Sequence, residues 1–198
     1  MICRANINER IKRYSELLNY IDGDKDLYAP ESPINVTPEE CREAIQRLDG
    51  PLYLERKIRL YVLLRLDQAL SGGEAVYAFK RITVEHVLPQ HPSEGSQWLQ
   101  WFPHEELREH YVHRLGNLAL LSGYKNSRAQ NFDFETKKDK YFTGDDGSTP
   151  FTMTSQVLKE IEWTPEVIAQ RQELLMSRLK QLWRLEEPAS VAQPATVA

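Results

Sequence analysis

The residues most able to do chemistry in this chain are its histidines and the polar residues around them. All five histidines fall between positions 86 and 113. Glu85 directly precedes the first of them, and two asparagines, Asn117 and Asn126, follow the last. A neutral imidazole can take a proton from water near pH 7, and carboxylate and amide oxygens are ligands for hard divalent cations. Together these residue types suit the hydrolysis of a phosphodiester, which needs an activated water and stabilisation of charge on the phosphate oxygens.

Two short apolar runs around these residues predict strands. The β-branched run at residues 82–87 is stopped by Pro89, and a second candidate strand covers residues 115–121. A serine–glycine turn follows, and a helix is expected to begin at about Lys125. The predicted order is therefore strand, long loop, strand, turn and helix.

That order brings the end of the first strand beside the start of the helix. Glu85 and His86 end the first strand, Asn117 begins the second, and Asn126 lies early on the helix. We expect these four side chains to converge on a volume the size of one phosphate and one metal ion. His86 would take the proton from water, while Glu85 and Asn126 would supply oxygen ligands to Mg²⁺, which keeps several of its waters in proteins.

Apolar spacing and capping residues predict helices on both sides of this module. The predicted helices cover residues 6–20, 37–49, 51–70, 103–113, 134–141 and 164–185. The second begins with Thr37 as its N-cap, Pro38 at the first helical position and Glu40 completing a capping box. We therefore predict an α+β fold that is mostly helical, with a ββα-metal module braced by N-terminal and C-terminal helices.

The predicted domain organisation follows from these elements. Residues 1–81 form an N-terminal helical brace, and residues 82–142 form the ββα-metal core. Residues 143–187 form a loop and a C-terminal helix that packs on the core. Residues 188–198 lack periodicity and are expected to be a disordered tail.

Composition excludes several other classes of protein. The apolar fraction of 41% and the charged fraction of 27% are ordinary for a soluble globular protein. No apolar run is long enough to cross a bilayer or to form a signal peptide, so we expect a cytoplasmic location. Cys3 and Cys41 form no CxxC pair, so neither a zinc ribbon nor a disulfide framework is indicated. The net charge of −4 argues mildly against tight independent binding of nucleic acid, because such binding relies on neutralising phosphates.

The motif residues resemble a known family. Residues 85–90 (EHVLPQ), residues 114–121 (RLGNLALL) and Asn126 resemble the HNH, or His-Me finger, nuclease domain at the C-terminus of GmrSD-type restriction enzymes. The same domain type occurs in SspE-type defence nickases that guard phosphorothioate-modified DNA. Weaker similarity extends to residues 61–66, 131–132, Lys138, Tyr141, residues 163–164 and Arg171. Each piece is weak alone, whereas the ordered set is more specific.

The resemblance implies a role for each motif residue. His86 is the general base, and Glu85 is the acidic metal ligand before it. Asn117 is the middle asparagine, whose side chain fixes the loop that orients the histidine. Asn126 is a metal ligand on the helix, and Asn131 is the weaker alternative. The family implies one Mg²⁺ or Mn²⁺ per site, so the chain is expected to be a DNA nickase in restriction or anti-phage defence.

The resemblance also bears on partners. GmrSD-type proteins usually carry an N-terminal nucleotide-hydrolysing domain that senses modified DNA. Nothing in this sequence resembles that domain, and no glycine-rich loop of the P-loop type is present. We therefore expect double-stranded DNA as the substrate and no membrane partner, with sensing by a separate subunit or by another part of a longer protein.

A locally basic stretch is the predicted DNA contact. Residues 122–141 contain five Lys or Arg against three Asp or Glu, in a chain whose net charge is negative. We expect Lys125, Arg128, Lys137 and Lys138 to contact the DNA backbone. A solvated helix face explains the same charges equally well.

Other uses of the remaining histidines stay open. His110 and His113 have helical spacing and could ligate zinc together with His104 or His91, although no cysteine is near. We favour surface or substrate-side positions for all four.

Two alternatives concern the function of the whole domain. The first is a decayed HNH fold that only binds DNA or a partner, and the second is a nuclease that acts on RNA. Trp98 and Trp101 could stack on bases, but a cluster that anchors the loop is favoured.

Overall fold

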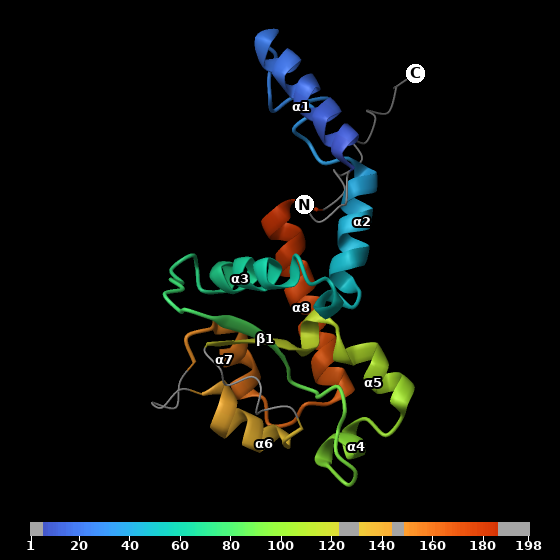
Figure 1. Cartoon of the computed structure of the whole chain (residues 1–198), viewed down its shortest axis with the longest axis vertical. Coiled ribbons are helices and arrows are strands. Elements are labelled where there is room, and N and C mark those ends of the chain that lie inside the picture. Colours follow the sequence, from blue (N-terminus) through green and yellow to red (C-terminus); the bar gives the residue numbers. More distant parts are fainter. Residues whose placement is uncertain (1–5, 123–130, 144–148, 186–198) are drawn as a thin grey trace, which may run out of the picture. The chain divides into compact units, whose positions relative to one another are not determined.

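The computed structural model describes residues 6–122, 131–143 and 149–185. These residues belong to two compact units, one formed by Met1–Arg47 with Arg184–Ala198 and the other by Leu48–Trp183. Figure 1 gives the element labels used below. None of the described helices combines the length and the apolar character needed to cross a membrane.

The N-terminal unit contains α1 (Ile7–Asp22) and most of α2 (Pro38–Asp49). The predicted capping box of α2 is confirmed, because the Glu40 amide donates to Thr37 Oγ1 at 3.2 Å and the Thr37 amide donates to Glu40 Oε2 at 2.8 Å. The Arg13 guanidinium then donates to both oxygens of the same Glu40 carboxylate, at 2.6 and 2.9 Å. One carboxylate thus caps α2 and ties it to α1.

The larger unit is built on a two-stranded antiparallel sheet of β1 (Ile82–His86) and β2 (Leu118–Ser122). In its register Glu85 faces Ala119 and His86 faces Leu118. Together with the surrounding helices, this small sheet confirms the α+β class.

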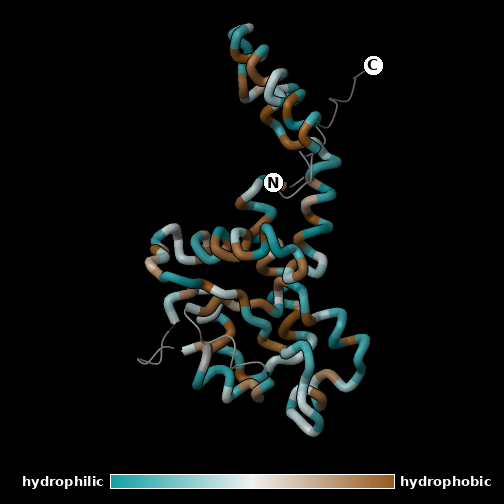
Figure 2. The backbone as a smooth tube through the Cα atoms, in the orientation of Figure 1, coloured by the Kyte–Doolittle hydropathy of each residue, from teal (hydrophilic) through white to brown (hydrophobic). Residues whose placement is uncertain are grey.

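Helices and short turns enclose the sheet (Figure 1). They are η1 (Leu52–Leu54), α3 (Arg59–Leu70), α4 (Gln97–Trp101), α5 (Glu105–Val112), η2 (Leu115–Asn117), α6 (Phe134–Lys137), the π-helical η4 (Lys138–Phe142), α7 (Thr152–Lys159) and α8 (Pro165–Trp183). Helix α7 packs on β2 and on α3, while α8 packs on η2. Figure 2 shows hydrophobic residues alternating with hydrophilic ones along these helices, as helices with one side facing a shared core require.

Aromatic residues dominate the core under the sheet. Trp98, Phe102, Phe134 and Trp163 are all fully buried there. The Trp98 indole donates to the carbonyl of Phe132 at 2.9 Å, so this ring anchors the long loop as the favoured prediction stated.

Two predicted elements differ from the structure. The helix expected over residues 51–70 is broken, because the backbone of Tyr53 bonds elsewhere: its amide donates to the His113 carbonyl and its own carbonyl accepts from Arg59. The second strand begins three residues later than predicted, after the turn η2. Helices α4 and α7 were not predicted.

The turn η2 is held from the side by α8. The Arg171 guanidinium donates to the carbonyls of Gly116 (2.7 Å) and Leu118 (3.0 Å), and the Gln172 amide oxygen accepts from the Gly116 amide at 2.6 Å. These bonds satisfy backbone groups that would otherwise be buried without partners. They also fix the backbone on both sides of Asn117.

Gly116 provides a test of this packing. A Cβ at this position would lie 2.5 Å from the carbonyl oxygen of Ile168 and 3.0 Å from the amide of Gln172. We expect Gly116→Ala to lower the free energy of unfolding by about 3 kcal/mol, because α8 would have to move. Gly95→Ala is the matched control, since Gly95 has a φ of +74° but no atom within 4 Å of its Cβ. That control should cost only about 1 kcal/mol of backbone strain in chemical denaturation, and equal losses in both variants would contradict the packing argument.

Candidate functional site

The last two residues of β1 have separate surroundings. Successive side chains of a strand point to opposite faces, and Glu85 and His86 follow this rule. Glu85 contacts Lys137 at the end of α6, whereas His86 contacts Tyr53, Gln90 and His113. Both side chains are almost completely buried, with exposed fractions of 5% each.

Glu85 forms a buried ion pair. The Lys137 ammonium donates to Glu85 Oε1 at 3.3 Å and to the His86 carbonyl at 2.7 Å, and Lys137 has no exposed surface. Burial raises the pKa of Glu85 and lowers the pKa of Lys137, while the attraction between the two charges opposes both shifts. The pair fixes the carboxylate and the backbone at the end of β1 together.

His86 lies in an aromatic and polar enclosure on the other face. Its ring centroid is 3.9 Å from that of Tyr53, its Nε2 is 3.1 Å from His113 Nδ1, and its Nδ1 is 3.3 Å from Gln90 Nε2. Burial is the main reason why the pKa of His86 falls from its ordinary 6.5 to about 3, and the neighbouring His113, Lys137 and Arg59 add to this shift by charge repulsion. His86 is therefore neutral near pH 7, which is the protonation state a general base needs.

Asn117 holds the segment that follows β1. Its Oδ1 accepts from the Leu88 amide (2.7 Å) and from the Trp163 indole (3.0 Å), and its Nδ2 donates to the carbonyls of Leu88 (3.0 Å) and Val112 (2.9 Å). Its own carbonyl accepts from the Val87 amide at 2.9 Å. Asn117 therefore ties the loop after His86 to the end of α5, which is the geometry that its predicted positioning role requires.

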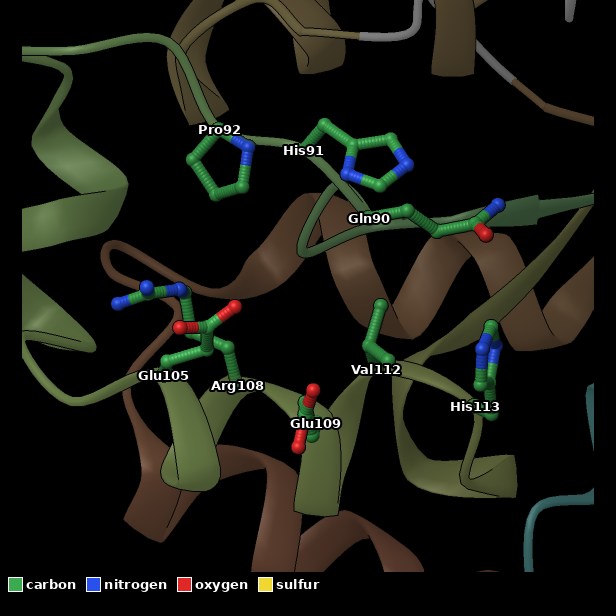
Figure 3. Close-up of a pocket in the computed structure, with 8 residues that line it drawn as sticks. All are labelled: Gln90, His91, Pro92, Glu105, Arg108, Glu109, Val112 and His113. Atoms are coloured by element: carbon green, nitrogen blue, oxygen red, sulfur yellow. The ribbon is translucent and has the colours of Figure 1, made fainter.

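A pocket of about 390 Å³ opens beside this arrangement (Figure 3). It is lined by Gln90, His91, Pro92, Glu105, Arg108, Glu109, Val112 and His113. In the view of Figure 3, Gln90 and His113 lie on the same side of the pocket. Because both contact His86, they connect the pocket to the buried histidine.

The described residues do not by themselves fit a divalent metal ion. Of the two main predicted ligands, only Glu85 lies among them, and its carboxylate is engaged with Lys137. Asn131, the weaker alternative, is also described and is exposed. The residues that the structure describes contain no group of three or more His, Cys, Asp or Glu that could hold a metal. Asn126, the other predicted ligand, lies outside the described residues. The described residues therefore do not form a complete metal site.

Of the four predicted DNA-contacting residues, two lie outside the described residues and two lie within them. Lys125 and Arg128 lie outside the described residues. Lys137 is enclosed, and its ammonium serves Glu85 and His86, which differs from the surface position that a DNA contact needs. The Lys138 ammonium is bonded within the protein as well, to Glu135 at 2.8 Å and to the Glu160 carbonyl at 3.0 Å. The sequence does not reveal that buried acceptors hold the long side chain of Lys137 inside the protein.

Three residues around His86 were not predicted as site residues. Tyr53 comes from η1, Gln90 from the loop after β1, and His113 from the end of α5. Gln90 is part of the EHVLPQ motif, so the motif itself could have indicated it. Tyr53 and His113 reach His86 only through tertiary packing. The two histidines considered for zinc have different partners, since His113 contacts His86 whereas His110 contacts Arg114.

His86 ends β1, and Asn117, the residue directly before β2, holds the loop that follows His86. In a comparison with protein families, residues 42–178 match the model of the C-terminal domain of GmrSD restriction endonucleases. The chain belongs to this family. Membership implies an endonuclease role in restriction, with DNA as the substrate. Comparison with curated proteins finds no match.

The low pKa of His86 makes folding stability depend on pH. The unfolded chain binds a proton on this residue below about pH 6.5, whereas the folded protein does so only near pH 3. The contribution of the unprotonated His86 to the free energy of unfolding is therefore complete above pH 6.5, and it is lost as the pH falls below that value. Between pH 6.5 and 5, we expect the free energy of unfolding to fall by up to about 1.4 kcal/mol per pH unit more in the wild type than in His86→Asn. Urea denaturation at several pH values measures both slopes, and equal slopes would contradict the burial of an unprotonated His86.

Proposed function

We propose that this chain is a metal-dependent endonuclease that nicks double-stranded DNA, with His86 as the general base, in defence against foreign DNA. The observation that carries the proposal is the buried, neutral His86 at the end of β1, held in place by Asn117 and adjoining a pocket. Membership of the restriction endonuclease family supports the same chemistry.

The environment of His86 suits a base that acts only when substrate is bound. Burial and nearby cations keep the pKa of the free imidazole low. A phosphate that approaches the site brings negative charge, which favours the protonated imidazole and raises the pKa of His86. The base would therefore strengthen as the DNA arrives, and it would not be held protonated in the free protein.

The other motif residues have supporting roles in this proposal. Asn117 keeps the loop after His86 in one conformation, through its bonds to Leu88. Asn126 is a proposed ligand of Mg²⁺ or Mn²⁺, and Glu85 would join it only by leaving its ion pair with Lys137. A divalent cation in such sites stabilises charge on the phosphate oxygens. Lys125 and Arg128 remain the proposed contacts to the DNA backbone.

A plasmid-nicking assay tests the role of His86. With Mg²⁺ or Mn²⁺, the wild type should convert supercoiled plasmid to the open circular form, and His86→Ala should reduce the rate at least about 100-fold, because loss of a general base typically costs that much. His104→Ala is the matched control, since His104 is exposed and does not line the pocket. Equal nicking by the wild type and His86→Ala would end the assignment.

The same assay separates the alternatives. DNA binding without cleavage by the wild type would favour a non-catalytic module. Cleavage of RNA in preference to DNA would favour an RNA-directed nuclease. A panel of supercoiled, linear and RNA substrates therefore accompanies the variants.

The metal ligands are tested by comparing two asparagines. We expect chelation by EDTA to abolish nicking and excess Mn²⁺ to restore it. Asn126→Ala should raise the Mn²⁺ concentration needed for half-maximal nicking about 10-fold or more, because one cation ligand is lost. Asn131→Ala is the matched control and should leave that concentration unchanged. The reverse result would move the ligand from Asn126 to Asn131.

A further inference from the structure

Both ring nitrogens of His86 have polar neighbours. The Nε2 atom is 3.1 Å from His113 Nδ1, and the Nδ1 atom is 3.3 Å from the amide nitrogen of Gln90. A neutral imidazole has one N–H and one lone pair, whereas a side-chain amide nitrogen only donates. These neighbours therefore decide which nitrogen of His86 can accept a proton from water.

The proton positions follow from the Gln90 amide. Its nitrogen donates to His86 Nδ1, so Nδ1 carries the lone pair and the proton of His86 is on Nε2. His86 Nε2 then donates to His113 Nδ1, which places the proton of His113 on its own Nε2. A half turn of the Gln90 amide would move the ring proton of each histidine to its other nitrogen. The tautomer of His86 can therefore be tested directly by experiment.

The ring and the backbone of His113 are held in position by Tyr53 and Asn117. Its carbonyl accepts from the Tyr53 amide at 3.0 Å, and its ring stacks on the Tyr53 ring with an interplanar angle of 11°. The Arg59 guanidinium lies 4.0 Å from the centroid of the same Tyr53 ring. Asn117 adds a bond to the carbonyl of Val112, the residue before His113. The backbone and the ring of His113 are thus both fixed beside His86.

We infer that His113 is a positioning residue for His86. By accepting the hydrogen bond from the Nε2–H group, it holds His86 in the tautomer whose Nδ1 is basic and directs that atom toward Gln90, a residue that lines the pocket. In the free protein the Gln90 amide is hydrogen-bonded to His86 Nδ1. In the proposed reaction this amide moves aside, and a water binds to Nδ1 instead. The inference rests on the proposed function, because it specifies which atom of the proposed base receives the proton.

Two substitutions of His113 separate its hydrogen bond from its packing. His113→Phe keeps a ring that can stack on Tyr53 but removes the acceptor. His113→Asn keeps an acceptor atom near the place of Nδ1 but removes the ring. For a positioning role, we expect His113→Phe to lower kcat for nicking at least about 10-fold, as loss of an orienting partner typically does. His113→Asn should stay within about threefold of the wild type, whereas a packing role predicts the opposite order.

Nitrogen-15 NMR of the imidazole rings gives a readout that does not depend on cleavage. At pH 7 the wild type should show His86 protonated on Nε2 and unprotonated on Nδ1, and His113→Phe should lose this single tautomer while His113→Asn keeps it. A wild-type His86 protonated on Nδ1, or an unchanged tautomer and rate in His113→Phe, would overturn the inference. If the wild type does not nick DNA, the proposed function fails, and the NMR result still decides whether His113 sets the tautomer.

Discussion

Four hydrogen bonds converge on the side-chain amide of Asn117, which has no exposed surface. A buried amide without partners costs several kcal/mol, so each of these partners is held in place by the need to satisfy it. Two of the bonds go to Leu88, two residues after His86, and one goes to the carbonyl of Val112, directly before His113. The placement of both histidines therefore depends on one side chain. Arg171 and Gln172 of α8 in turn fix the backbone on either side of it.

The two faces of β1 bury ionisable side chains in different ways. On one face a carboxylate is buried, and Lys137 compensates it while also binding the His86 carbonyl. Removing one partner of such a pair would leave a buried charge unmatched, which is costly. On the other face an imidazole is buried without a charged hydrogen-bond partner, so it stays neutral. The same strand thus presents a fixed ion pair and a neutral imidazole on opposite sides, because its side chains alternate.

The charge of the chain limits how it can meet DNA. Its net charge is −4, and the pocket beside His113 is lined by two glutamates and one arginine. The ammonium groups of Lys137 and Lys138 are used within the protein. A domain of this kind would depend on a few local cations, or on another domain, for affinity, since phosphate neutralisation supplies most non-specific binding.

Local patterns in the sequence determined the type and order of the main elements. Capping residues marked α2 and α8 closely, and the β-branched run marked β1, because these signals act between residues near one another in the chain. The motif also singled out His86 and Asn117, and the structure brings them together through the loop between them. Tertiary structure alone decided the rest. Tyr53 left its predicted helix because its backbone bonds to His113 and Arg59, and Lys137 turned inward because a buried carboxylate and a carbonyl needed a donor. Arg59 lies only six positions from Tyr53, but His113 is 60 positions from Tyr53 and Glu85 is 52 positions from Lys137, so no local pattern could reveal these two partners.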